Sequence, residues 1–220
     1  MTWQPKDELA SAVALEVLIH GPLGRAELAR RLGLAPATLT RISTELIASG
    51  LLAEVPEATQ RTSGRPTIPL DVVPSSHYFL GIKLTDSALD ATVIDLKATP
   101  RDSYRVPLES LTPVRVVRAI AYLAHLARSS YRIDAIGIAV GGIVNADGTV
   151  ESAPFLKWSN VPLASLVSEA THLPAFVAND LSAYTQIQHW FGSGTGHSNF
   201  AVITVGVGVG YGCVANGARL

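Results

Sequence analysis

Residues 36–45 carry polar side chains of the kinds that contact nucleic acid. Thr38, Arg41 and Glu45 are spaced for one face of a helix, with Thr40 and Thr44 beside them. Short hydroxyls and an arginine near the start of a helix can reach phosphates and base edges in the major groove of DNA. A plain helical bundle with a solvated polar face is the alternative interpretation. The candidate DNA-binding residues are Arg25, Pro36, Thr38, Thr40, Arg41, Thr44, Arg61 and Arg65.

The last two of these residues lie in a short basic segment, 60–66, that has no acidic residue between Arg61 and Arg65. Runs with strand character flank it at 51–55 and 67–70. A basic hairpin beside a recognition helix can lay arginines on phosphates or into a narrow minor groove. An ordinary linker between two domains is the alternative.

A second group of polar residues follows two expected strands. Gly141 and Gly142 come after residues 135–140, and Asn179 and Asp180 come after residues 175–178. Open α/β sheets bind ligands at the carboxyl ends of their strands. An amide beside a carboxylate can hold vicinal hydroxyls or position a general base. Both residue types also favour helix N-caps, and the two roles are compatible.

The elements that position the first group are three helices, expected at 9–20, 25–32 and 36–49. Apolar residues at helical spacing predict the first helix, and Gly21-Pro22 ends it. Ala29 is small where two helices would cross, Gly33 suits a turn with positive φ, and Leu39 begins the buried face of the third helix. This combination is typical of a helix-turn-helix.

From residue 78 the pattern changes to short apolar runs that alternate with helices. Strands are expected at 78–84, 89–95, 101–106, 135–140, 175–178 and 200–205, and helices at 113–130, 163–171 and 181–191. This order predicts an α/β layer with a mixed sheet. The glycine-rich segment 206–212 is either a phosphate-binding turn or a tightly packed pair of strands.

Composition bounds these interpretations. The 220 residues are 48% hydrophobic and 16% charged, which favours a packed globular protein. The net charge of −1 means that any DNA contact is local, and the modest affinity of one such module predicts a dimer that reads two half-sites. The single cysteine, Cys213, excludes an internal disulfide. We see no signal peptide and no apolar run that spans a bilayer, so we expect a cytoplasmic protein with no membrane partner.

Taken together, the motifs resemble the ROK family of bacterial repressors and sugar kinases. The likeness runs from Ala12 to Leu220. The segments that carry it are the helix-turn-helix 25–52, the Gly64-Arg65-Pro66 wing, and residues 136–144, 158–163, 179–183, 191–192 and 206–212.

The resemblance implies the fold class α/β with an N-terminal winged helix-turn-helix at 1–73. It implies that residues 74–220 form the first lobe of an actin-like ATPase (RNase H-like) fold with a mixed sheet. Gly141, Gly142, Asn179 and Asp180 would bind a sugar, with Asp180 at the position of the catalytic base in the kinases. The implied partners are a double-stranded DNA operator, a sugar or sugar-phosphate effector, and further copies of the chain in a homodimer or a dimer of dimers.

Departures from the family pattern favour a regulator over an enzyme. Kinases of the family carry Asp-x-Gly-Gly-Thr after the first strand, where this chain has Lys83, Leu84, Thr85, Asp86 and Ser87. The replacement removes the metal-organising acid and the glycines, and it adds a carboxylate where a polyphosphate would lie. Val207 stands where the kinases have Thr. We therefore expect no catalytic residues and a transcription regulator of sugar-metabolism genes. The alternatives are a sugar kinase with a fused DNA-binding domain and a winged helix that binds protein.

Other departures concern the ligand. Phe155 and Gln188 replace an Asn and a Glu that are common in the family. The family's second lobe supplies a Glu and a His for the sugar and a Cys/His zinc cluster, and neither set is present before Leu220. We therefore expect a truncated chain, no metal or cofactor within it, and zinc only in a missing C-terminal lobe.

Overall fold

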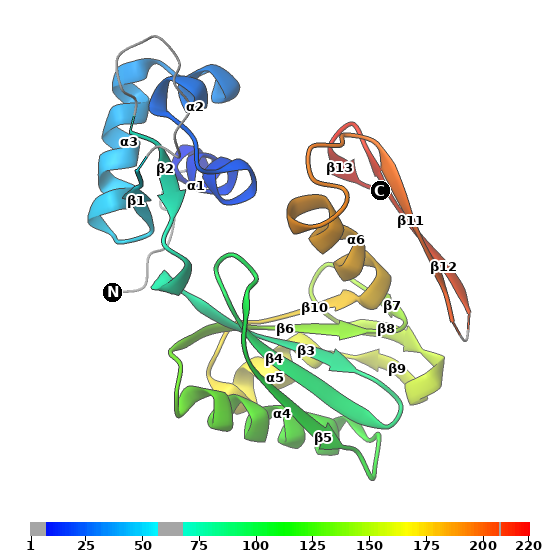
Figure 1. Cartoon of the computed structure of the whole chain (residues 1–220). Helices are drawn as coiled ribbons and strands as arrows, with labels where there is room; N and C mark the ends of the chain where they lie inside the picture. Colours follow the sequence, from blue (N-terminus) through cyan, green and yellow to red (C-terminus); the bar gives the residue numbers. More distant parts are fainter. Residues whose placement is uncertain (1–7, 57–67, 207) are drawn as a thin grey trace. The chain divides into compact units, whose positions relative to one another are not determined.

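The computed structural model describes residues 8–56, 68–206 and 208–220. It divides the chain into two compact units, Met1–Ser76 and His77–Leu220 (Figure 1). The boundary expected from the sequence, between residues 73 and 74, lies just before the short 3-10 helix η1 (Pro74–Ser76). No helix in the described ranges has the length and apolar character needed to cross a membrane.

The first unit consists of three helices and a two-stranded antiparallel sheet. The elements are α1 (Glu8–His20), α2 (Arg25–Leu32), α3 (Pro36–Ala48), β1 (Leu52–Glu54) and β2 (Leu70–Val72). The helices share a core of fully buried side chains: Val13, Val17, Leu28, Leu39, Ile42 and Leu46. Of the expected buried face of α3, only Ile47 is less than fully buried, and the hydroxyl of Ser43 is buried instead.

Gly33 makes the sharp turn between α2 and α3. Its φ is 63°, in the left-handed region, and the N–H of Leu34 donates to the Ala29 carbonyl oxygen at 2.9 Å. Pro36 occupies the first turn of α3, where its missing N–H costs no helical hydrogen bond. The positive φ that the sequence predicts at Gly33 is therefore confirmed.

The second strand of this unit lies further along the chain than the sequence predicts. It was expected at 67–70, but β2 spans Leu70–Val72 and pairs Leu52 with Val72 and Glu54 with Leu70. Pro69 has no N–H to donate to a neighbouring strand, so it lies just outside the paired segment. Burial of Leu70 and Val72 then fixes which residues face the helices.

The second unit is built on a mixed five-stranded sheet with strand order β10-β6-β3-β4-β5. β3, β4 and β5 form an antiparallel meander, and β6 and β10 run parallel to β3. The strands are β3 (Tyr78–Leu84), β4 (Ala88–Asp95), β5 (Pro100–Pro107), β6 (Ile133–Val140) and β10 (Ala175–Asn179). The mixed sheet and the approximate positions of its strands agree with the sequence prediction.

The helices α4 (Pro113–Arg128) and α5 (Leu163–Thr171) lie on one face of this sheet, and α6 (Asp180–Phe191) follows β10 directly (Figure 1). Apolar side chains of α4, including Val116, Ile120 and Leu123, pack in one core with Leu80 and Ile136 of the sheet. Because β6 and β10 are parallel neighbours, their carboxyl ends lie side by side. The residues predicted to bind a sugar follow these two ends.

The strand expected at 200–205 is confirmed, but the sequence did not predict the two small antiparallel sheets, one of which contains it. One contains β7 (Ile143–Val144), β8 (Val150–Ala153) and β9 (Trp158–Val161), separated by the 3-10 helix η2 (Pro154–Leu156). The other contains β11 (Phe200–Val205), β12 (Val209–Ala215) and β13 (Ala218–Arg219). The strands β7 and β13 have two residues each, which is too short for alternation to identify them.

The glycine-rich segment 206–212 is largely a strand and not a loop. Gly210 and Gly212 lie within β12, which packs against α6. A Cβ atom at Gly212 would lie 2.0 Å from the Thr185 hydroxyl oxygen, and one at Gly210 would lie 2.8 Å from the Leu181 side chain. The glycines therefore allow close packing of strand on helix, which was the second of the two readings of this segment.

Candidate functional site

The outer face of α3 exposes most of the residues predicted to contact DNA. Pro36, Thr40, Arg41 and Thr44 are exposed, whereas Thr38 is half-buried. The Thr40 hydroxyl donates to the Pro36 carbonyl oxygen at 2.8 Å, and the Thr44 hydroxyl donates to the Thr40 carbonyl oxygen at 2.8 Å. Because each hydroxyl has a single proton, both side chains present acceptor lone pairs outward. They are therefore suited to accept hydrogen bonds from base amino groups.

Arg41 pairs with Glu45 one turn along the same helix, with 2.8 Å between nitrogen and oxygen. Both side chains are more than half exposed, and an exposed pair at this spacing contributes only about 0.3–0.5 kcal/mol. The guanidinium can thus exchange Glu45 for a phosphate or a base edge at low cost.

Arg25 lies in a different environment from Arg41. Its guanidinium donates to Glu54 of β1 at 2.8 Å and to the buried Ser43 hydroxyl of α3 at 3.3 Å. The side chain therefore ties α2 to both α3 and β1. Its contact with DNA stays a prediction, and the structure gives it a role in holding the elements of the unit together.

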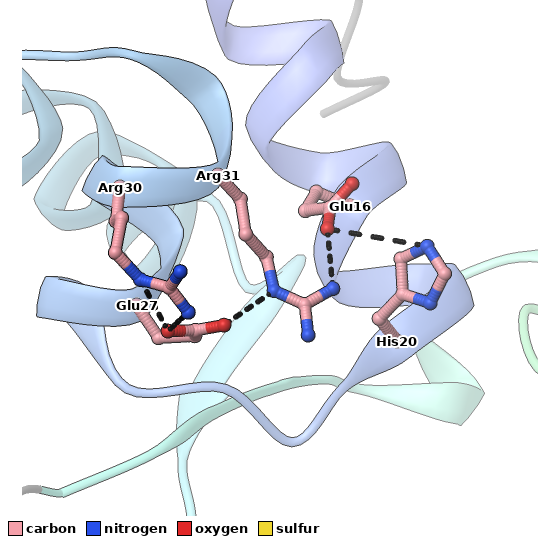
Figure 2. Close-up of polar contacts among 5 residues, drawn as sticks. All are labelled: Glu16, His20, Glu27, Arg30 and Arg31. Carbon is pink, nitrogen blue, oxygen red and sulfur yellow. Dashed lines mark hydrogen bonds and ion pairs between the residues drawn. The ribbon is translucent and has the colours of Figure 1, made fainter. Parts of the chain in front are cut away.

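The remaining arginines of α2 belong to a network of ion pairs with α1, shown in Figure 2. Arg31 contacts Glu27 at 2.7 Å and Glu16 at 3.0 Å, and Arg30 also pairs with Glu27. Glu16 lies 3.9 Å from the His20 ring. Hydrogen bonds from Arg30 and then Arg31 hold the pKa of Glu27 below its ordinary value.

This network limits the local DNA contact that the sequence predicts. Arg25, Arg30, Arg31 and Arg41 all pair with glutamates of the first unit, so these arginines do not form an open basic surface. Sequence spacing could have indicated the Glu27–Arg31 pair, which is at i, i+4, but not the contact with Glu16 on another helix. Arg61 and Arg65 lie outside the described residues, and their role stays a prediction.

In the second unit the structure brings together the four residues predicted to bind a sugar. Asn179, the last residue of β10, lies beside Val140, the last residue of β6, and Gly141 and Gly142 follow. The Asp180 carboxylate lies over Gly141, where an added Cβ would be 3.7 Å from its Oδ2. All four therefore meet at the carboxyl ends of two parallel strands.

Within this group Asn179 uses both ends of its amide for hydrogen bonds within the protein. Its amide nitrogen donates to the Gly142 carbonyl oxygen at 2.9 Å, and its amide oxygen accepts from the Ser182 N–H at 3.0 Å as the N-cap of α6. Asp180 is exposed, and its Oδ1 accepts from the Leu181 N–H at 2.8 Å. Asp180 is thus the group with acceptor capacity for a ligand, and Asn179 fixes the backbone around it.

Gly142 lies where no larger residue fits. A Cβ at this position would be 2.3 Å from the Ser152 carbonyl oxygen of β8. Gly142 therefore allows β8 to lie close to the segment that follows β6. The sequence interpretation, in which these glycines admit a ligand to the backbone, remains a prediction for both Gly141 and Gly142.

The turn after β3 has the geometry of a closed hairpin turn. The Thr85 hydroxyl accepts from the Ala88 N–H at 3.0 Å and from the Ser87 N–H at 3.4 Å, and it donates to the Ala88 carbonyl oxygen at 2.9 Å. A phosphate bound at this turn would accept hydrogen bonds from its backbone N–H groups. The Thr85 hydroxyl already accepts hydrogen bonds from two of these groups, those of Ser87 and Ala88. Lys83 and Asp86 flank this turn, and Val207 lies outside the described residues.

A hollow of about 170 Å³ lies between α6 and the β12–β13 pair, next to Asn179. Leu181, Ser182, Tyr211, Cys213 and Arg219 are among the residues that line it. No sequence pattern indicated it, because its walls come from segments that only the fold brings together. In the described ranges, no three His, Cys, Asp or Glu side chains lie close enough to hold a metal ion.

Comparison with known proteins places the chain in a family. Residues 79–220 match the ROK family, and the chain belongs to it. It is 26% identical to the xylose repressor of Bacillus subtilis (strain 168) over 207 residues, which cover 91% of this chain and 53% of the repressor. It is 35% identical to a glucokinase of Streptomyces coelicolor over 136 residues, covering 61% of this chain and 43% of the kinase.

A solved structure of a ROK family transcriptional regulator, a homologue of the Escherichia coli MLC protein, superposes with a TM-score of 0.80 at 27% identity. The match covers 97% of this chain and 57% of that one. The chain spans about half the length of the curated relatives it matches. The likeness to regulators includes the first unit, whereas the likeness to the glucokinase is shorter than the second unit alone.

Proposed function

We propose that this chain is part of a sequence-specific DNA-binding transcription regulator, a repressor of sugar-metabolism genes, whose DNA affinity is modulated by a sugar or a sugar phosphate. One observation carries the proposal: the likeness to a xylose repressor and to a ROK regulator extends over 91% and 97% of the chain, and so includes the first unit. Kinases need no such unit for phosphoryl transfer.

In this proposal α2, the Gly33 turn and α3 form a helix-turn-helix with α3 as the recognition helix. The exposed side chains of Thr40, Arg41 and Thr44 face the bases. The β1–β2 pair flanks the segment that carries Arg61 and Arg65, which act as the wing. Arg25 supports the angle between α2 and α3 through Glu54 and Ser43.

The test is DNA binding by the purified protein to a sequence selected from random duplexes, with and without a panel of sugars and sugar phosphates. Arg41→Ala is expected to weaken binding to the selected site by about 1–3 kcal/mol. Arg105→Ala is the matched control, because it removes an exposed arginine with one carboxylate partner from the second unit. Equal affinity of wild type and Arg41→Ala, or an equal loss in both variants, would contradict the assignment of α3.

A sugar kinase with a fused DNA-binding domain is the second candidate, favoured by the 35% identity to the glucokinase. The Thr85 turn argues against it, since its hydroxyl bonds the N–H groups of Ser87 and Ala88. We expect no ATP-dependent phosphorylation of glucose, N-acetylglucosamine or xylose under conditions where the glucokinase turns over. Measurable turnover would establish the second candidate instead.

A further inference from the structure

The outward face of α4 has an unusual set of side chains for a helix that only covers a sheet. Val114, Arg115, Arg118, Tyr122 and His125 are all exposed and recur at the spacing of a single helical face. Val114 is 71% exposed and Tyr122 is 55% exposed. The opposite face of the helix, including Val116, Ile120 and Leu123, is fully buried in the core. We call the exposed set the α4 face.

The α4 face is positively charged and lacks counter-charges. The helix contains three arginines and a histidine but no Asp or Glu. Within the described ranges, neither Arg115 nor Arg118 makes an ion pair or a side-chain hydrogen bond. On the neighbouring strand β5, by contrast, Arg101 pairs with Asp95 and Arg105 with Asp90. Glu169, an exposed acid of the adjacent α5, is not paired with α4.

Folding does not explain these charges. Arg115 lies in the first turn of α4, where the positive end of the helix dipole disfavours a cation. Arg118 follows at i+3, and like charges at this spacing repel. An acidic or neutral residue at either position would stabilise the helix better. The helix dipole and the repulsion between the two arginines therefore give no stabilising reason for this charge.

We propose that the α4 face is a docking surface for an acidic protein partner, which places carboxylates against Arg115 and Arg118 and apolar side chains against Val114 and Tyr122. Arginine and tyrosine are enriched at protein interfaces, where they carry much of the binding energy. A DNA backbone is a poorer fit, because only two arginines, flanked by an exposed valine and an exposed tyrosine, match few phosphates. The α4 face is a single helix, so the interface buries little surface area and we expect the complex to be transient.

The residues of this partner surface all belong to α4, so the proposal does not rest on the DNA or sugar sites. Binding of a protein to this surface would act on the second unit in addition to the proposed sugar or sugar phosphate. Since α4 shares its core with β4 and β6, a partner bound there contacts the element that supports the carboxyl end of β6.

The test uses a synthetic helical peptide with glutamates and leucines on one face, and a second peptide in which glutamine replaces every glutamate. Binding to the whole chain is measured by fluorescence anisotropy, and the amide NMR shifts of α4 locate the contact. We expect the acidic peptide to shift α4 residues and to bind about tenfold more weakly to the double variant Arg115→Ala/Arg118→Ala. Tyr122→Ala is expected to weaken binding as well.

The control is Arg105→Ala/Arg132→Ala, which removes two exposed arginines of the same unit that have carboxylate partners. We expect this control to bind the acidic peptide like the wild type. We also expect Arg115→Ala/Arg118→Ala to unfold at the same temperature as wild type or higher, which separates lost binding from lost structure.

Three outcomes would overturn the proposal. The first is equal binding of the acidic and glutamine peptides, and the second is an equal loss in the control double variant. The third is tighter binding of duplex DNA or of phosphatidylglycerol vesicles to the same face, with loss in Arg115→Ala/Arg118→Ala, which would assign the face to phosphates.

Discussion

At the scale of single residues, Asn179 and Asp180 are adjacent in the chain but make different kinds of contact. Asn179 uses both ends of its amide on the protein, through Gly142 and Ser182. Asp180 is exposed and contacts the N–H of Leu181. A substitution at Asn179 therefore changes the shape of the loop, whereas a substitution at Asp180 changes what the site offers a ligand.

This difference gives a prediction for the sugar response. Asp180→Asn keeps an oxygen that can accept from the Leu181 N–H but loses the charge that accepts strong hydrogen bonds from sugar hydroxyls. We expect the variant to bind DNA like wild type without sugar and to lose the response to the active sugar, measured as DNA affinity over a sugar titration. Glu169→Gln, which removes an exposed acid elsewhere in the second unit, is the control and should respond normally.

If Asp180→Asn responds to sugar like wild type, the assignment of Asp180 to the ligand site is wrong. Loss of DNA binding without sugar would instead mean that its role is structural. Asn179→Ala separates the two roles further. It removes the N-cap of α6, which costs about 0.5–2 kcal/mol, so it should lower the stability of the second unit.

At the scale of elements, the geometry of the first unit depends on the short turn between α2 and α3. Gly33 adopts a φ of 63°, and nothing lies within 4 Å of a Cβ added there. The requirement for glycine is therefore conformational and not steric. Arg25 reinforces the same arrangement, because it connects α2 to Ser43 of α3 and Glu54 of β1.

We therefore expect Gly33→Ala to destabilise the first unit by about 1–2 kcal/mol, the usual cost of left-handed backbone for a residue with a Cβ. Gly33→Asn should cost less, because asparagine tolerates this conformation better. Urea denaturation followed by circular dichroism measures both. Equal stability of wild type and Gly33→Ala would show that the turn does not constrain the helices.

At the scale of the whole molecule, the surface charge limits how tightly one copy can hold DNA. The net charge is −1, and Arg30 and Arg31 are neutralised by Glu27 and Glu16. In the proposed function few phosphate contacts remain for one copy, so we expect affinity to depend on the pairing of two copies on two half-sites.

The corresponding prediction concerns the spacing of half-sites. We expect a duplex with two half-sites to bind much more tightly than a duplex with one. Inserting about 5 base pairs between the half-sites, roughly half a helical turn, should reduce affinity to that of a single half-site. An insertion of about 10 base pairs, which returns them to one face of the DNA, is the control. Affinity independent of the spacing would mean that single copies bind.

The sequence by itself determined the local elements and the residue types at the two sites. Helical periodicity, Gly33 and Pro36 predicted α2, the turn and α3, because each of these signals acts within one or two helical turns. The apolar runs likewise predicted most strands of the five-stranded sheet. Belonging to the ROK family and the order of the motifs were also evident from the sequence.

Only the tertiary structure decided how individual side chains are used. Arg25 and Asn179 were both predicted to bind ligands, but each has a partner from a distant segment: Glu54 and the Gly142 carbonyl. Arg31 likewise pairs with Glu16 of another helix. The packing of Gly212 against Thr185 likewise decided between the two alternatives for the glycine-rich segment, in favour of a packed strand. The physical reason is the same throughout. Hydrogen bonds and close contacts between segments far apart in the chain depend on the folded arrangement, which local sequence patterns do not contain.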